Sequence, residues 1–135
     1  DFALTLRDFI LLIAAALPRN ELQKLFDCAT GLGLDVLCEA HTRDEVLTLL
    51  DIGAEIIGIN SRDLKTFKTD LKVAETMIQT IPDSHIKIAE SGINTADDIK
   101  NLLRTGASGF LIGESIMREA DPGEALAKLI EEARK

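Results

Sequence analysis

Short apolar runs alternate along the chain with segments in which apolar residues recur at three- and four-residue spacing. The runs are typical of strands buried on both faces of a parallel sheet, and the segments are typical of amphipathic helices. The runs begin at Phe9, Asp35, Glu55, Ile86 and Gly109. This pattern predicts five consecutive β-α units with parallel strands and crossover helices, which is an α/β fold.

Polar residues and prolines mark the expected ends of these elements. The predicted strands cover residues 9–17, 35–40, 55–60, 86–90 and 109–113. We expect Asn20, after Pro18, to cap the first helix, and Thr42 to form a capping box with Glu45 three residues later. Further helices are predicted from about residue 70 to residue 80, after Thr95, and from residues 121–122 onward.

Two architectures are compatible with this alternation, an open doubly wound sheet and part of a (β/α)8 TIM barrel. No G-x-G-x-x-G motif opens the first helix, so nothing supports a dinucleotide-binding fold. The nearly uniform spacing of the units favours the barrel, which typically needs about 250 residues and eight strands. The sequence therefore predicts a partial TIM barrel, a single incomplete domain over residues 1–135 in which residues 1–8 form an irregular or truncated lead-in.

Composition narrows the class of protein. With 46% hydrophobic and 28% charged residues, the chain is expected to be globular, and its longest apolar run, residues 9–17, is too short to cross a bilayer. We expect no signal peptide, and we interpret Cys28 and Cys38 as small core residues of a cytoplasmic protein. A net charge of −8 argues against a broad nucleic-acid or membrane surface, but it leaves a small phosphorylated ligand possible.

Polar residues collect where the predicted strands end, and in a barrel the carboxyl ends of the strands surround one mouth. These residues are Glu39, Asn60, Arg62, Glu90, Ser91, Gly92, Gly113, Glu114 and Ser115. The glycine-containing turns after the last two strands would suit a phosphate group, because backbone amides can approach its oxygens there.

Each charged residue in this set also has a simpler interpretation. Glu39 and Glu90 follow apolar strands, so each is either available for proton transfer or paired with Arg62 or Lys87. Arg62 either clamps a phosphate or carboxylate, or forms a surface salt bridge with Asp63. The spacing does not decide between these alternatives.

His41 follows Glu39 closely but has no triad partner in the sequence, and we interpret it as a surface or capping residue. The cysteines have no metal-ligand spacing, so no metal site is predicted.

Several of these segments resemble a known family. Residues 57–67 (IGINSRDLKTF), 88–93 (IAESGI) and 110–118 (FLIGESIMR) resemble indole-3-glycerol-phosphate synthase of tryptophan biosynthesis. Residues 11–17 (LLIAAAL) and 34–41 (LDVLCEAH) fit the same family. The resemblance extends from about residue 10 to the carboxyl terminus, and it implies that strands four to eight of a (β/α)8 barrel are present.

The resemblance also implies an activity, that of a carbon-carbon lyase of the carboxy-lyase type. Its substrate would be 1-(2-carboxyphenylamino)-1-deoxyribulose 5-phosphate, a sugar phosphate whose ring closure releases carbon dioxide and water without a cofactor or metal. By motif, Glu39, Asn60 and Glu90 would be catalytic, and Arg62 and Ser91 would bind substrate. Phosphate would be bound by Gly92, Gly113, Glu114 and Ser115.

The chain departs from the family pattern at its start. The family's first and third strands supply lysines, and here Arg7-Asp8-Phe9 only imitates the K-D-F motif of strand three. An arginine stays protonated and donates protons poorly near neutral pH. We therefore expect this chain to shape part of the site without completing the reaction. The alternatives are a non-catalytic fragment that forms a homo-oligomer through exposed barrel edges, and another phosphate-binding barrel enzyme.

Overall fold

A computed structural model describes residues 9–63 and 65–135 of the chain, so the expected lead-in over residues 1–8 lies outside the described residues. Five parallel strands form one sheet, in the order in which they occur in the chain. They are β1 (Phe9–Ile13), β2 (Asp35–Ala40), β3 (Ile56–Asn60), β4 (Ile86–Glu90) and β5 (Gly109–Leu111). This order matches a barrel, because a doubly wound sheet reverses its strand order at a switch point.

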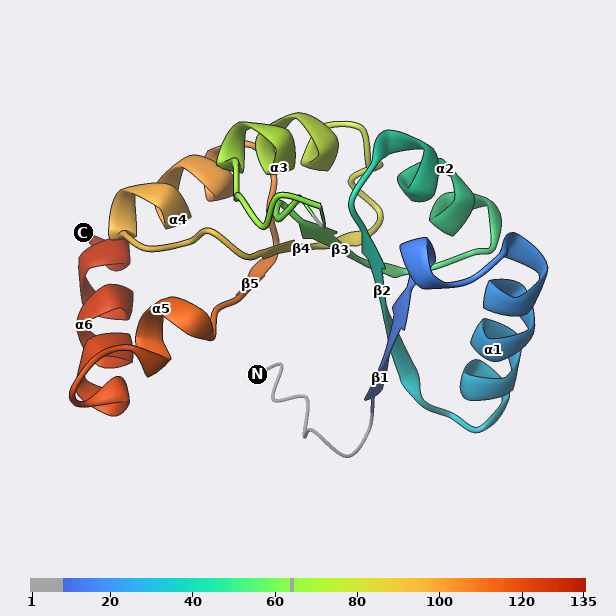
Figure 1. Ribbon diagram of the computed structural model, residues 1–135, viewed down its shortest axis with the longest axis horizontal. Helices are drawn as coiled ribbons and strands as arrows, with labels where there is room; N and C mark the ends of the chain where they lie inside the picture. Colours follow the sequence, from blue (N-terminus) through green and yellow to red (C-terminus); the bar gives the residue numbers. More distant parts are fainter. Residues whose placement is uncertain (1–8, 64) are drawn as a thin grey trace.

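Helices follow each strand, and the last two come after β5. In chain order, the helices are η1 (Ala14–Ala16, a 3-10 turn), α1 (Arg19–Gly31), α2 (Arg43–Asp51), α3 (Leu71–Ile78), α4 (Ala96–Arg104), α5 (Glu114–Met117) and α6 (Pro122–Arg134). Figure 1 shows the strands following one another along an arc, with α1 to α4 on its outer side. Within the described residues β1 and β5 each keep one unpaired edge, so the sheet is open and forms a partial barrel.

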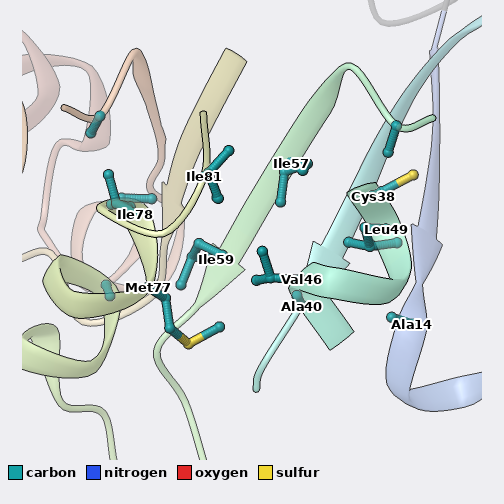
Figure 2. Close-up of a cluster of buried hydrophobic side chains, with 14 of the residues drawn as sticks. Ala14, Cys38, Ala40, Val46, Leu49, Ile57, Ile59, Met77, Ile78 and Ile81 are labelled. Carbon is teal, nitrogen blue, oxygen red and sulfur yellow. The ribbon is translucent and has the colours of Figure 1, made fainter. Parts of the chain in front are cut away.

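The hydrophobic core lies between the sheet and these outer helices. Cys38 and Ala40 of β2 and Ile57 and Ile59 of β3 are completely buried, and they alternate along their strands with residues of the inner face. Their side chains meet those of α2 and α3, which include Val46, Leu49, Met77 and Ile78 (Figure 2). Burying a side chain of this size contributes about 1.5–3 kcal/mol, so stability resides mainly on the outer face of the sheet.

Three predictions about the first unit were wrong. Strand β1 ends at Ile13, and the three alanines that follow turn as η1, since alanine has little preference for a strand. Asn20 lies inside α1, where Pro18 is the N-cap and no side chain caps the helix. Cys28 is exposed on α1, whereas Cys38 is buried as expected.

Side-chain caps mark the N-termini of several other helices. Thr95 and Asp98 form a complete capping box on α4, and the Asp121 side chain accepts a hydrogen bond from the backbone of Glu124 at the start of α6. The Thr42 side chain caps α2, at 3.2 Å from the amide of Glu45, but the predicted capping box is incomplete because the Glu45 carboxylate bonds the amide of His41 instead. Among the described residues, no helix is both long and apolar enough to span a bilayer.

The capping box on α4 generates a stability prediction. Replacing Thr95 with Ala should lower the free energy of unfolding by about 1 kcal/mol, because the amide of Asp98 loses its acceptor. Thr95→Ser should retain most of that stability. Asn20→Ala is the matched control and should not destabilise the protein, because Asn20 caps nothing. Urea unfolding of the three variants measures the difference, and equal losses for Thr95→Ala and Asn20→Ala would contradict this interpretation.

Candidate active site

The inner face of the sheet carries polar residues near the carboxyl ends of three neighbouring strands. Glu39 of β2 is in register with Gly58 of β3, and Asn60 of β3 is in register with Glu90 of β4. Residues in register on parallel strands point to the same face, as do residues two apart on one strand. All four residues therefore belong to the inner face, opposite the helices.

Two carboxyl groups are buried next to each other on this face. Glu39 is 7% exposed and Glu90 is 3% exposed. The Glu90 side chain leans over β3, where a Cβ on Gly58 would lie only 1.9 Å from Glu90 Oε1. The absence of a side chain at position 58 is therefore what lets the Glu90 carboxyl occupy this place.

The two carboxyl groups interact strongly. Burial first, and then the charge of the Glu39 carboxylate and a hydrogen bond with it, raise the pKa of Glu90 to about 8. Two neighbouring carboxyl groups in a site of low polarity do not both ionise readily, and this favours the protonated form of Glu90. At neutral pH Glu90 is therefore a carboxyl group that can donate a proton.

Asn60 and His41 both contact the same oxygen of Glu39. Asn60 Nδ2 donates to Glu39 Oε1 at 3.1 Å, and Asn60 Oδ1 accepts from the Arg62 amide at 3.1 Å, which fixes the orientation of the side-chain amide. His41 Nε2 lies 3.2 Å from Glu39 Oε1, and the imidazole is 8% exposed. The expectation that His41 is a surface or capping residue was therefore wrong.

The simpler interpretations of the charged residues were also wrong. Arg62 pairs with the Glu114 carboxylate, which also contacts Arg118 at 2.5 Å, and it does not pair with Asp63. Asp63 instead accepts hydrogen bonds from the backbone amides of residues 65 and 66, and these bonds hold its pKa below the ordinary value. Lys87 points to the outer face and pairs with the carboxylate of residue 83 at 2.7 Å. Neither Glu39 nor Glu90 forms an ion pair with Arg62 or Lys87.

The turn after β4 has an unusual backbone. Ser91 and Gly92 have φ angles of 64° and 74°, and such a conformation is strained for serine. The buried Ser61 hydroxyl supports this turn, with its oxygen 3.3 Å from the carbonyl of Glu90 and 3.0 Å from that of Ser91. A Cβ on Gly92 would come within 3.0 Å of Thr69. Sequence reasoning assigned no role to Ser61, although it stands in the polar loop that follows β3.

The residues after β5 close the other side of the site. Gly113 is the N-cap of the short helix α5, which the sequence pattern did not predict. The Ser115 hydroxyl donates to the carbonyl of Ile93 at 2.9 Å, so it joins this helix to the turn after β4.

One cleft of about 1130 Å³ unites the predicted site residues. All nine of them line it, namely Glu39, Asn60, Arg62, Glu90, Ser91, Gly92, Gly113, Glu114 and Ser115. In the part of the chain that the structure describes, no cluster of histidine, cysteine, aspartate and glutamate side chains is arranged to hold a metal ion. The chemistry that the cleft offers is proton transfer between carboxyl groups, beside an arginine that can hold an anion.

Comparison with known proteins connects this cleft to a family. The family model described as indole-3-glycerol phosphate synthase matches residues 3–129. The indole-3-glycerol phosphate synthase of Koribacter versatilis is 46% identical over 123 residues, which are 91% of this chain and 47% of that protein. That of Ruminiclostridium cellulolyticum is 44% identical over 129 residues, which are 96% of this chain and 50% of that protein. The chain thus spans about half the length of the curated relatives that it matches.

Solved structures with much lower sequence identity share the fold. The thiamine phosphate pyrophosphorylase from Pyrococcus furiosus has a TM-score of 0.70 at 18% identity, over 94% of this chain and 59% of that one. A native KDPGal structure has a TM-score of 0.61 at 18% identity, over 91% of this chain and 55% of that one. These similarities confirm the α/β class and the barrel-like order of the strands.

The raised pKa of Glu90 predicts how stability depends on pH. The folded protein keeps a proton on Glu90 up to about pH 8, whereas the unfolded chain releases it near the ordinary value of 4.5. Because the unfolded state binds fewer protons in this window, the free energy of unfolding should fall as the pH rises from 4.5 to 8. Each pKa unit corresponds to about 1.4 kcal/mol.

Glu90→Gln should remove this part of the pH dependence. Its stability relative to the parent protein should therefore rise between pH 5 and pH 8, as measured by urea unfolding at several pH values. Glu55→Gln, which changes an exposed glutamate, is the control and should leave the slope unchanged. If the free energy of unfolding changed with pH in the same way for the parent and Glu90→Gln, the pKa of Glu90 would not be raised.

Proposed function

Because the chain belongs to the indole-3-glycerol phosphate synthase family, we propose that its cleft binds 1-(2-carboxyphenylamino)-1-deoxyribulose 5-phosphate and takes part in its closure to the indole ring. In that reaction a carbon–carbon bond forms, the carboxylate leaves as carbon dioxide, and a hydroxyl leaves as water. The observation that supports this assignment best is the buried pair of Glu39 and Glu90 in the cleft, in which the pKa of Glu90 is raised to about 8. A closure with loss of water needs a proton donor and a proton acceptor close together.

The roles of the catalytic residues follow from their surroundings. We assign Glu39 as the group that accepts a proton from the substrate, since it lines the cleft and the Asn60 amide holds it there through a hydrogen bond. Glu90 keeps its proton at neutral pH and donates it to the departing hydroxyl. Asn60 also lines the cleft, where its amide hydrogen-bonds the hydroxyls of the sugar-derived chain. We propose these three residues as the catalytic set.

Two groups of residues would hold the charged ends of the substrate. Arg62 binds the carboxylate of the anthranilate part. To do so, its guanidinium must release the Glu114 carboxylate with which it is paired. Ser91 binds the substrate next to Arg62. The phosphate is held at Gly92, Gly113, Glu114 and Ser115, where Glu114 contributes its backbone amide because its own carboxylate would repel the phosphate.

The partners and the compartment follow from the same features. A net charge of −8 supports a small-molecule substrate over nucleic acid or an anionic membrane. Cys28 and Cys38 are both free thiols, which supports the reducing environment of the cytoplasm.

Replacing Arg62 tests the proposed substrate. Arg62→Gln should weaken binding of the carboxyphenylamino-deoxyribulose phosphate about 10-fold or more, because a charge-assisted hydrogen bond to a carboxylate contributes about 1.5–3 kcal/mol. Binding of ribulose 5-phosphate, which lacks the anthranilate part, should stay within a factor of about two. Isothermal titration calorimetry measures both affinities.

Lys68→Gln is the matched control, because it removes an exposed cation from the same loop and should change neither affinity. If Arg62→Gln weakened both ligands equally, the assignment of Arg62 to the carboxylate would be wrong. If the parent chain bound ribulose 5-phosphate but not the larger compound, the proposed substrate itself would be wrong.

The open sheet supports a second candidate, a fragment that forms a homo-oligomer. Leu11 of β1 and Leu111 of β5 are 43% and 51% exposed, and their registers place both on the inner face. Exposed apolar side chains beside an unpaired strand edge favour pairing with another chain.

Double substitution of Leu11 and Leu111 with Lys tests this association. The parent chain should sediment as a concentration-dependent oligomer, and the double variant should stay monomeric, because lysines at both edges oppose strand pairing. Leu32→Lys, which changes an exposed leucine next to α1, should behave like the parent. Analytical ultracentrifugation distinguishes these outcomes, and a monomeric parent at all concentrations would exclude the second candidate.

A further inference from the structure

His41 lies directly beyond β2, where its imidazole is enclosed between two carboxylates. Its Nε2 is 3.2 Å from Glu39 Oε1, and its Nδ1 is 3.7 Å from Glu45 Oε2. Neither contact is aligned as a hydrogen bond, so both ring nitrogens are buried with only electrostatic partners. A buried polar ring is unfavourable unless its neighbours compensate for the lost water, and here the compensating groups are the two carboxylates.

Glu45 is itself held firmly. Its carboxylate accepts a hydrogen bond from the backbone amide of His41 at 2.7 Å, and its own amide is 3.2 Å from the Thr42 hydroxyl. In an ordinary capping box this carboxylate would bond the amide of residue 42. Here it reaches one residue further back, to the residue whose ring faces Glu39. The start of α2 therefore fixes both the backbone and the ring of His41.

The contact has a consequence for Glu39. Oε1 of Glu39 is approached by Asn60 Nδ2 from β3 and by His41 Nε2 from its own strand. The hydrogen bond from Asn60 and the close contact with His41 both fall on Oε1, so they restrict the rotation of the carboxylate and leave Oε2 as the oxygen that exchanges a proton. A general base needs this kind of fixed geometry toward the atom that it deprotonates.

We propose that His41 is a positioning residue, which holds the Glu39 carboxylate in the orientation for proton transfer and is itself held by Glu45. The proposal rests on the proposed function, in which Glu39 is the proton acceptor. The titratable groups around the imidazole are Glu39 on its own strand and Glu45 from α2, with Glu90 of β4 one contact further away. The turn η1, which also packs against this region, consists of three alanines.

A purely structural role would make different predictions. If the imidazole only filled space beneath α2, an apolar side chain of similar size would serve as well, and the carboxyl pair would titrate as before. If it holds Glu39, removing the imidazole removes a close polar contact with the carboxylate and makes the pair harder to ionise.

Titration of the carboxyl groups by 13C NMR separates the two roles. In His41→Leu the titration of Glu90, expected near pH 8 in the parent, should move upward by about one pH unit. His41→Gln keeps an amide donor at similar reach and should titrate close to the parent. Spectra of Glu39→Gln and Glu90→Gln assign the two carbons. An unchanged titration in a folded His41→Leu protein would overturn the proposal, as would equal changes in the two His41 variants.

A second measurement needs no variant at His41, so it stands even if His41→Leu does not fold. In 15N spectra of the parent chain, the Nε2 signal of His41 should shift with the same midpoint as the Glu90 carboxyl carbon, and Glu39→Gln should abolish that step. His85, whose Nδ1 contacts the Ser84 hydroxyl at 3.1 Å, is the internal control and should show no such step. If the Nε2 chemical shift of His41 did not change across the carboxyl titration, the proposal would be overturned.

Measuring substrate affinity separates a failure of this proposal from a failure of the proposed function. His41→Leu should bind the carboxyphenylamino-deoxyribulose phosphate within a factor of about two of the parent, since a positioning residue acts through Glu39 and not on the ligand. A large loss of affinity would make His41 a binding residue and overturn the positioning role. If the parent bound no substrate at all, the proposed function would fail, while the coupling of His41 to the carboxyl pair would still be decided by the NMR titrations.

Discussion

The candidate site depends on the close approach of two buried carboxyl groups, Glu39 and Glu90, which raises the pKa of Glu90. Glu90 reaches toward Glu39 by lying over Gly58, the one position between them on the inner face that has no side chain. The strand register places these three residues together, so the proton held by the site is a consequence of how β2, β3 and β4 pair. A slip of β2 or β4 by one residue would move the carboxyl group of that strand to the helix side of the sheet.

The two faces of the sheet divide the requirements of stability and chemistry between them. On the outer face, Ile57 and Ile59 pack against apolar side chains of α2 and α3, and the buried Lys87 is paired with the carboxylate of Asp83. On the inner face, the polar loops are supported by hydrogen bonds from neighbouring loops, such as that between Ser61 and the strained turn at Ser91. The inner face can therefore keep an unusual backbone and a raised pKa, because the outer face supplies most of the stabilising burial.

The elements of the fold could be predicted well because most of their signals are local. The strands over residues 35–40 and 86–90 have the predicted bounds, since each is an apolar run that ends at polar residues. Strand β1 was predicted too long because alanine does not distinguish a strand from a turn. The site residues could be collected at the strand ends, but their pairings could not. Arg62 meets Glu114, 52 positions further along the chain, and the burial of His41 depends on how α2 packs.

The distribution of charge in the cleft supports Glu90 as the proposed proton donor. The cations that line the cleft are Arg62, Arg118 and Lys128, and the two arginines are committed to Glu114. An arginine stays protonated near neutral pH, so it can hold an anion but hardly donates a proton. Lys128 is exposed on α6, away from the carboxyl pair at the carboxyl ends of β2 and β4. Among the charged groups that line the cleft in the described part of the chain, a carboxyl group is therefore the proton donor that we propose. Burial and a like-charged neighbour are what keep that group protonated.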